Sequence, residues 1–150
     1  MNRPLPPELH PDTLAVRAGT ERTQFREHGE AMYLTSSFVF GSAAQAAACF
    51  SGEEEGYVYA RFSNPTVTAM QTRLAALEGG EDCVAPAAGM SALLSLAMAT
   101  MQAGDHVGAS NGLFGATQQL FGGILSKFGI RTTFVPATDL DAWRAAITPH

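Results

Sequence analysis

Apolar and polar positions follow different patterns on either side of residue 56. After it, short apolar runs alternate with segments in which apolar side chains recur every three or four residues, as in amphipathic helices. The clearest such segment follows Asn64 and Pro65, a helix cap and a favoured first helical residue, and it ends at Gly79. The apolar residues that share one face of this predicted helix are Val67, Met70, Leu74 and Leu77.

The rest of this region continues the alternation. Strands are predicted at 82–86, 106–110 and 131–136, and helices at 89–102, 113–128 and 139–147. Strands that alternate with helices through short turns are typical of an α/β architecture with a mainly parallel sheet. Because so few strands are present, we expect the sheet to be incomplete.

The first 56 residues have the pattern of an arm. Short helices are predicted at 12–18 and, after Ser42 as a cap, at 43–50. The prolines that exclude regular structure at the start are Pro4, Pro6, Pro7 and Pro11. We therefore predict an arm over residues 1–56 and the beginning of a larger domain over residues 57–150.

Composition and charge narrow the class of protein. Of the 150 residues, 46% are hydrophobic and 15% are charged, which is globular and suggests surface that more chain or another subunit covers. With a net charge of −5 and scattered basic residues, no nucleic-acid or anionic-membrane partner is expected. Residues 84–103 carry no charge, but Pro86 and Gly89 interrupt them, so we expect a buried helix and not a membrane span.

Cysteine and histidine spacing predicts no metal site. Cys49 and Cys83 lack CxxC spacing, and the histidines lack the spacing of metal ligands. Two buried thiols in a reducing compartment, and a start unlike a signal peptide, indicate a cytoplasmic protein. Residues 147–150 do not resemble a natural helix end, so we expect the sequence to continue beyond them.

Three stretches are candidates for chemistry. Tyr59 and Arg61 would point to one side of an extended segment, where a phenol and a guanidinium suit a phosphate. Small residues over 85–92 lead into a predicted helix whose first N–H groups could bind an anion. Phe114 follows a predicted strand and could stack on a planar ring. Taken singly, they are explained better by a packed surface pair, a tight turn and a core aromatic.

Together and in this order, these stretches resemble one family, the pyridoxal-phosphate (PLP) enzymes of cysteine and methionine metabolism. That family contains cystathionine synthases and lyases, methionine γ-lyase and homoserine sulfhydrylases. The matching stretches are Asp12 to Gly19, Thr35 to Phe38, Tyr59 to Arg61, Asn64 to Thr66, Ala75 to Gly79, Gly89 to Ala92, Gly104 to Val107 and Phe114 with Gly115. A general nucleotide-binding module is disfavoured, because the sequence has no phosphate-loop or dinucleotide fingerprint.

The resemblance implies a fold and a set of roles. The fold is an arm that packs on a partner subunit, followed by the first part of the large domain of a type I PLP-dependent transferase. Tyr59 and Arg61 match residues that bind the phosphate of the neighbouring subunit's cofactor. Gly89 and Met90 match backbone donors to the subunit's own cofactor phosphate, and Phe114 matches the aromatic residue that stacks on the pyridine ring. Family members are typically homotetramers.

The resemblance also implies an activity. It is greatest to the O-succinylhomoserine sulfhydrylase branch, which often has Phe at the position of Phe114. The expected reaction is γ-replacement, in which O-succinylhomoserine and sulfide give homocysteine in methionine biosynthesis. The alternatives in the family are cystathionine γ-synthase, O-acetylhomoserine sulfhydrylase and γ-lyase.

An alternative of another class is a truncated chain that is catalytically inactive. The resemblance implies that the Schiff-base lysine and the aspartate facing the pyridine nitrogen lie beyond residue 150, so no catalytic residue is expected in this chain. Lys127 is the only lysine, and its place near a predicted helix end indicates a structural role.

Overall fold

The computed structural model describes residues 9–149. The predicted irregular start at Pro4 to Pro7 lies outside these residues. The described chain forms two compact units, one ending at Ala85 and the other beginning at Pro86. The predicted division into an arm and a domain after residue 56 concerns packing on other subunits, and it stays a prediction.

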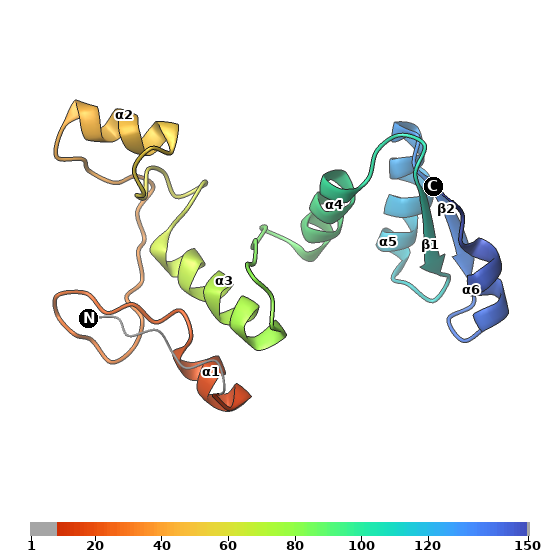
Figure 1. Ribbon diagram of the computed structural model, residues 1–150, viewed down its shortest axis with the longest axis horizontal. Coiled ribbons are helices and arrows are strands. Elements are labelled where there is room, and N and C mark those ends of the chain that lie inside the picture. The colour runs from red at the N-terminus through yellow and green to blue at the C-terminus, as the bar shows by residue number, and fades with distance from the viewer. Residues whose placement is uncertain (1–8, 150) are drawn as a thin grey trace. The chain divides into compact units, whose positions relative to one another are not determined.

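Helices dominate the first unit, and all three were predicted from local signals. They are α1 (Pro11–Arg17), α2 (Ala43–Ser51) and α3 (Pro65–Glu78) (Figure 1). The hydroxyl oxygen of Ser42 caps α2 by accepting from the N–H of Gln45 at 3.1 Å, and Gly52 ends that helix. Asn64 caps α3 in the same way through the N–H of Thr66.

A close approach joins α1 to α3. Gly19 has φ of +73°, and a Cβ there would overlap the backbone carbonyl of Ala69, so both conformation and space require glycine. Arg73 of α3 reaches back, donating from Nε to the carbonyl of Ala18 at 2.9 Å and pairing with the carboxylate of Glu30. The two helices lie side by side as a result (Figure 1).

The apolar face predicted for α3 remains partly exposed. Its residues Val67, Met70, Leu74 and Leu77 have exposed fractions between 37% and 51%, and the buried residue of the helix is Ala75. The reason is that α1 packs where α3 carries Ala69 and Arg73, and helical geometry places these two residues on a different side from the apolar stripe.

The second unit is built around a two-stranded parallel sheet. Strands β1 (His106–Ser110) and β2 (Arg131–Val135) pair in the register that places His106 opposite Arg131. The helices of this unit are α4 (Gly89–Thr100), α5 (Gly115–Gln119) and α6 (Leu140–Ala146), with the π-helical η1 (Leu120–Ile124) and the 3-10 helix η2 (Leu125–Phe128) following α5. This strand–helix–strand–helix order is the predicted α/β alternation.

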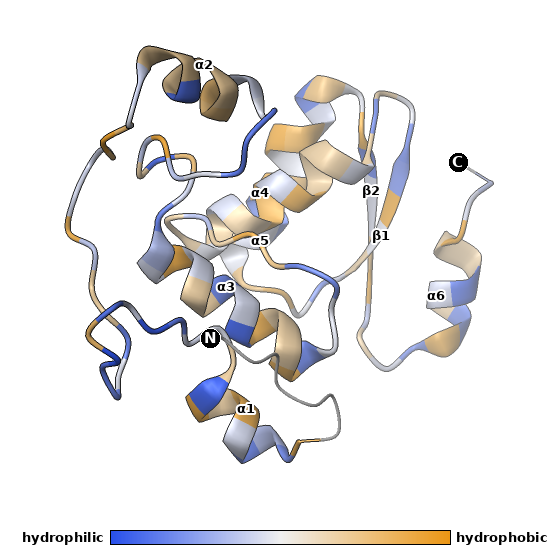
Figure 2. Ribbon diagram, turned by 60° about the vertical axis from the view of Figure 1, so that its left-hand side comes forward, coloured by the Kyte–Doolittle hydropathy of each residue, from blue (hydrophilic) through white to orange (hydrophobic). Residues whose placement is uncertain are grey.

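Adjacent residues of β1 face opposite sides of the sheet. Val107 packs on the core cluster, whose buried members are Ala97, Leu120, Leu125 and Ile130. Gly108 faces the other way, where a Cβ would lie 3.5 Å from the ring of Trp143 in α6. Figures 1 and 2 accordingly show α5 and α6 on opposite sides of the two strands.

The strand predicted at 82–86 is wrong. No strand pairing forms in this described segment, and the N–H of Ala85 instead donates to the side-chain oxygen of Gln71 at 2.8 Å. A side chain of α3 thus takes the hydrogen bond that a neighbouring strand would have taken.

The helix predicted over 113–128 is present but is not uniform. It passes from α-helical through π-helical to 3-10 geometry before it ends at Gly129. The π-helical turn contains Gly122 and Gly123, and a Cβ at Gly122 would lie 3.0 Å from the ring of Phe134 on β2. Two weak helix formers lie where the helix packs against the Phe134 ring, which explains the local change in hydrogen bonding.

Several groups expected to be buried are not. Although the ribbon of α4 is hydrophobic along most of its length (Figure 2), the helix buries only Ala97, and Leu96 and Met98 are more than half exposed. The thiols of Cys49 and Cys83 are free and half-buried, not buried. A two-stranded sheet offers too little surface to cover all sides of its helices.

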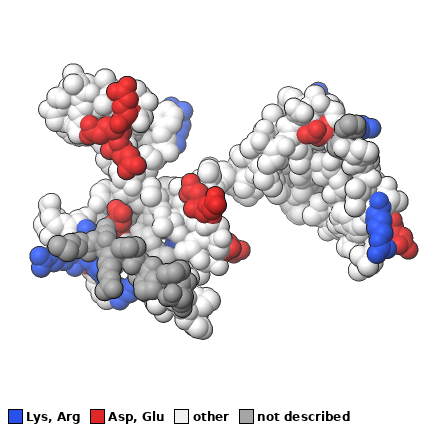
Figure 3. Space-filling model, viewed as in Figure 1, with Lys and Arg blue, Asp and Glu red and all other residues white. Residues whose placement is uncertain are grey.

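Charged side chains are spread over the surface. On the face shown in Figure 3, the basic side chains form small separate areas, and acidic side chains gather beside α2, which the acidic run 53–55 follows. No helix within residues 9–149 is long and apolar enough to cross a membrane. Across the same range, no three His, Cys, Asp or Glu side chains are grouped closely enough to hold a metal ion.

Candidate cofactor site

Tyr59 and Arg61 lie side by side, but not in the way predicted. The segment is not extended beyond Tyr59, because the N–H groups of Phe62 and Ser63 turn back to the carbonyl of Tyr59 at 2.9 and 3.1 Å. Tyr59 itself forms an antiparallel bridge with Ser37. The turn, rather than strand alternation, brings the phenol and the guanidinium together.

The guanidinium of Arg61 contacts aromatic rings and little else. Its central carbon lies 5.5 Å from the ring centroid of Tyr59 and 4.8 Å from that of Phe62. Within residues 9–149, the Arg61 side chain has neither an ion pair nor a hydrogen bond. All of its N–H donors therefore remain available to an anion.

The start of α4 is a second group of available donors. Ala88 occupies the N-cap position and has no side chain that can accept a hydrogen bond, so the first N–H groups, including those of Gly89 and Met90, are uncapped. A Cβ built on Gly89 would meet no described atom within 4 Å. Such a helix start favours negative charge.

The side chain of Met90 is fixed while its backbone N–H stays available. It packs against the core cluster of the second unit, and its sulfur accepts a hydrogen bond from the hydroxyl of Thr117 at 3.7 Å. Thr117 is buried, and its N–H donates to the carbonyl of Phe114 at 2.8 Å. One threonine thus connects the start of α4 with the start of α5.

Phe114 occupies the predicted place after a strand. β1 ends at Ser110, and Phe114 is the N-cap residue of α5 with 75% of its surface exposed. Phe114 is therefore not a buried core residue, which was the other interpretation of the sequence. The side-chain amide of Gln118 braces this loop by donating to the carbonyls of Asn111 and Leu113 at 2.9 and 2.8 Å.

Three residues outside the sequence-based predictions support these groups. The ring of Phe62 lies against the Arg61 guanidinium, and Thr117 and Gln118 hold the loops that carry Met90 and Phe114. An aromatic residue directly after an arginine was a visible signal for Phe62. No local pattern marks Thr117 or Gln118, because their partners are carbonyls and a sulfur that only the fold brings near.

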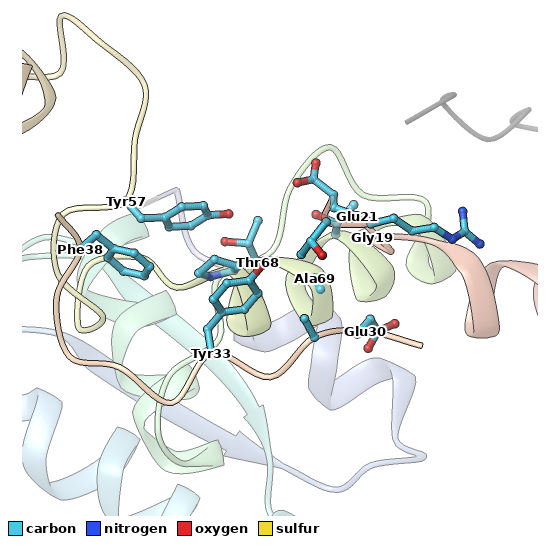
Figure 4. A pocket seen from close by; sticks show the side chains of 13 residues that line it. Gly19, Glu21, Glu30, Tyr33, Phe38, Tyr57, Thr68 and Ala69 are labelled. Atoms are coloured by element: carbon cyan, nitrogen blue, oxygen red, sulfur yellow. The ribbon is translucent and has the colours of Figure 1, made fainter. Parts of the chain in front are cut away.

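Two hollows in the first unit contain none of the predicted site residues. One has a volume of about 380 Å³, with the rings of Tyr33, Phe38 and Tyr57 at one end and the carboxylates of Glu21 and Glu30 at the other (Figure 4). The other, of about 840 Å³, is lined by residues of the loop over 23–33.

One carboxyl group near these hollows has a shifted pKa. The backbone N–H of Thr23 donates to the carboxylate of Glu27 at 2.8 Å, and the Thr23 hydroxyl donates to it at 2.7 Å. These hydrogen bonds stabilise the charged form and hold the pKa of Glu27 below its ordinary value, and the backbone hydrogen bond has the larger effect. The effect is local to the loop and does not involve the predicted site residues.

The residues predicted to bind pyridoxal phosphate fit the groups of that cofactor. The uncapped start of α4 and the guanidinium of Arg61 offer donors suited to a phosphate. The exposed ring of Phe114 offers a face to a planar heterocycle. The guanidinium of Arg61 belongs to the first unit, and the start of α4 and the ring of Phe114 belong to the second.

Comparison with known proteins points to the same chemistry. The sequence profile of the Cys/Met metabolism PLP-dependent enzymes matches residues 12–150. An O-succinylhomoserine sulfhydrylase of Pseudomonas aeruginosa is 53% identical over 139 residues, which are 93% of this chain and 34% of the relative. An L-methionine gamma-lyase of Fusobacterium nucleatum is 41% identical over 135 residues, 90% of this chain and 34% of that protein.

Solved structures extend the match to the fold. A Campylobacter jejuni structure described as an O-acetylhomoserine (thiol)-lyase, which carries N'-pyridoxyl-lysine-5'-monophosphate, matches with a TM-score of 0.84 and 33% identity. The match covers 94% of this chain and 35% of that one. The expected fold class, an incomplete large domain of a PLP-dependent transferase, is confirmed, and the chain spans about a third of the length of these relatives. On this sequence and structural evidence, the chain belongs to the family of Cys/Met metabolism PLP-dependent enzymes.

Proposed function

We propose that the intact protein catalyses γ-replacement, converting O-succinylhomoserine and sulfide to homocysteine and succinate in methionine biosynthesis. In this reaction the Cγ–O bond of the ester breaks, succinate leaves, and sulfide forms the new Cγ–S bond. The observation that carries the proposal is the 53% identity to the sulfhydrylase of Pseudomonas aeruginosa. Phe114 supports it, because the O-succinylhomoserine sulfhydrylase branch, which this chain resembles, often has Phe at this position.

Each predicted site residue has a role in this proposal. When bound, pyridoxal phosphate supplies the electron sink that allows the leaving group to depart from Cγ. The N–H groups of Gly89 and Met90 would hold its phosphate, and the exposed ring of Phe114 would lie against its ring and keep water from that face. The residues of this chain thereby anchor and orient, and the reacting lysine is supplied from elsewhere in the protein.

We further propose that the site is shared between subunits. Tyr59 and Arg61 would donate to the phosphate bound by the neighbouring protomer, which suits a guanidinium that has only ring contacts in its own described chain. Residues 1–56 would pack on that protomer as an arm, with the large domain beginning at residue 57. From the family resemblance we also propose a homotetramer, and from the free thiols of Cys49 and Cys83 a cytoplasmic location.

The family alternatives remain distinct, testable activities. The relative of Fusobacterium nucleatum at 41% identity is a methionine γ-lyase, and the Campylobacter jejuni neighbour is described as an acetylhomoserine enzyme. Steady-state assays of the intact protein separate them. We expect O-succinylhomoserine with sulfide to give the highest kcat/KM, ahead of O-acetylhomoserine, of cysteine as sulfur donor, and of methionine elimination. Higher kcat/KM with any of these would replace the proposal.

A second measurement addresses the alternative of an inactive chain. Residues 1–150 alone, mixed with pyridoxal phosphate, should show no protein-bound absorption band distinct from that of the free cofactor, because the expected lysine is not among them. A stable band that maps to Lys127 would contradict the assigned roles.

A further inference from the structure

Arg61 lies in a corner formed by two aromatic rings. The rings of Tyr59 and Phe62 have centroids 6.3 Å apart and planes inclined at 65°. The guanidinium carbon lies 4.8 Å from the Phe62 centroid, closer than its 5.5 Å from Tyr59. Phe62, to which the family resemblance gives no role, therefore makes the shorter of the two ring contacts.

Two inclined rings restrict a guanidinium more than one ring does. A single ring face leaves the planar group free to slide and rotate over it, whereas a second ring at a steep angle limits that motion. Both contacts are cation–π interactions, which engage the charge of the guanidinium without using its N–H donors as hydrogen bonds would. The N–H donors of Arg61 stay free while the guanidinium is restricted to fewer positions.

Packing within the described residues of the first unit does not account for Phe62. The side chain is 67% exposed, so it contributes little to an apolar core. Its described aromatic contacts are with Tyr59 and Arg61 only. A large exposed aromatic ring that lies against an arginine with neither an ion pair nor a hydrogen bond in the described part of the chain indicates that the ring serves the arginine.

We infer that Phe62 is a positioning residue: it holds the Arg61 guanidinium ready to bind the cofactor phosphate. The inference rests on the proposed phosphate role of Arg61 and adds the device that prepares it. Preorganisation reduces the entropy lost when the phosphate binds, so its removal weakens binding without removing a contact to the cofactor.

The test compares pyridoxal phosphate with pyridoxal, which has the same ring and aldehyde and no phosphate. Cofactor-free intact protein is titrated with each compound for the wild type, Phe62→Leu, Phe62→Trp, Arg61→Met and the double variant Phe62→Leu/Arg61→Met. A cation–π contact at an exposed site corresponds to a factor of about two to five in affinity. We expect Phe62→Leu to raise the Kd of pyridoxal phosphate by that factor and to leave the Kd of pyridoxal unchanged.

The other variants separate a positioning role from a structural one. Phe62→Trp, which keeps an aromatic face, should restore wild-type affinity, and Phe62→Leu should have no further effect once Arg61 is Met. An equal loss for both compounds, or an undiminished loss in the double variant, would overturn the inference alone. If Arg61→Met itself leaves the preference for pyridoxal phosphate over pyridoxal unchanged, the phosphate role of Arg61 fails, and the inference fails with it.

Discussion

The side-chain amide of Asn64 donates to the backbone carbonyl of Tyr33 at 3.0 Å. Its oxygen accepts from the N–H of Thr66 at 2.9 Å, and the Thr66 hydroxyl accepts from the N–H of Tyr33 at 2.9 Å. Only 6% of Asn64 is exposed. One buried asparagine therefore caps α3 and ties the segment around Tyr33 to the turn that carries Arg61.

Replacing this asparagine should destabilise the first unit. Asn64→Ala removes the cap, worth about 1 kcal/mol, and leaves the Tyr33 carbonyl without its donor, at a cost of about 1 to 3 kcal/mol. Urea unfolding of the intact protein should show a loss in this combined range. Thr66→Ser is the matched control, since it keeps the hydroxyl that Tyr33 uses and should change stability little. Equal stability of Asn64→Ala and Thr66→Ser would show that the bridge contributes nothing.

Comparing Gly19 with Gly52 separates the cost of a left-handed backbone conformation from the cost of steric overlap. Both have positive φ, +73° and +78°, but a Cβ on Gly19 would overlap the carbonyl of Ala69, whereas one on Gly52 would meet nothing described within 4 Å. Gly52→Ala should cost only the left-handed conformation, about 1 to 2 kcal/mol. Gly19→Ala should cost clearly more, because α1 must also move away from α3. Thermal unfolding of both variants measures the difference, and similar losses would contradict the close approach.

Local chemistry explains which elements the sequence revealed. Ser42 and Asn64 mark helix starts, and Gly129 a helix end, because caps act within one turn. No strand forms at 82–86, where the N–H of Ala85 donates to the side-chain oxygen of Gln71, 14 residues away on α3. A short apolar run carries no information about such a distant acceptor.

The candidate site shows the same limit. Phe114 was predicted correctly to follow a strand, because the order of elements alone places it there. The side-by-side arrangement of Tyr59 and Arg61 was also predicted, but from strand alternation, whereas a turn produces it. The bracing of the Phe114 loop by Gln118 depends on carbonyls at positions 111 and 113 that only the folded loop presents.

The carboxylate of Glu27 makes part of the stability depend on pH. The backbone and hydroxyl donors of Thr23 lower the pKa of Glu27 in the folded protein below its value in the unfolded chain. The unfolded state therefore takes up this proton first as pH falls. The stabilisation is fully present above the unfolded pKa and is lost as pH decreases through the folded one.

Unfolding measurements at a series of acidic pH values test this sign. The difference in unfolding free energy between wild type and Glu27→Gln should shrink as the solution is acidified below the ordinary range of glutamate. Thr23→Val, which keeps the backbone N–H and removes the hydroxyl, should show a smaller dependence in the same direction. A difference that grows on acidification would mean that the pKa of Glu27 is raised.

Gln118 and Gln119 allow a test of the loop that carries Phe114. Gln118 donates to the carbonyls of Asn111 and Leu113, whereas the exposed Gln119 has no side-chain hydrogen bond within the described residues. Gln118→Leu removes both bonds, each worth about 1 kcal/mol, so amide hydrogen exchange over 111–114 should accelerate about fivefold or more. Gln119→Leu makes the same chemical change one position along and should leave these rates as they are.

If the loop positions Phe114 for the cofactor ring, Gln118→Leu should also weaken pyridoxal and pyridoxal phosphate binding alike, because the ring is common to both. Faster exchange without weaker binding would show that Phe114 does not depend on this brace.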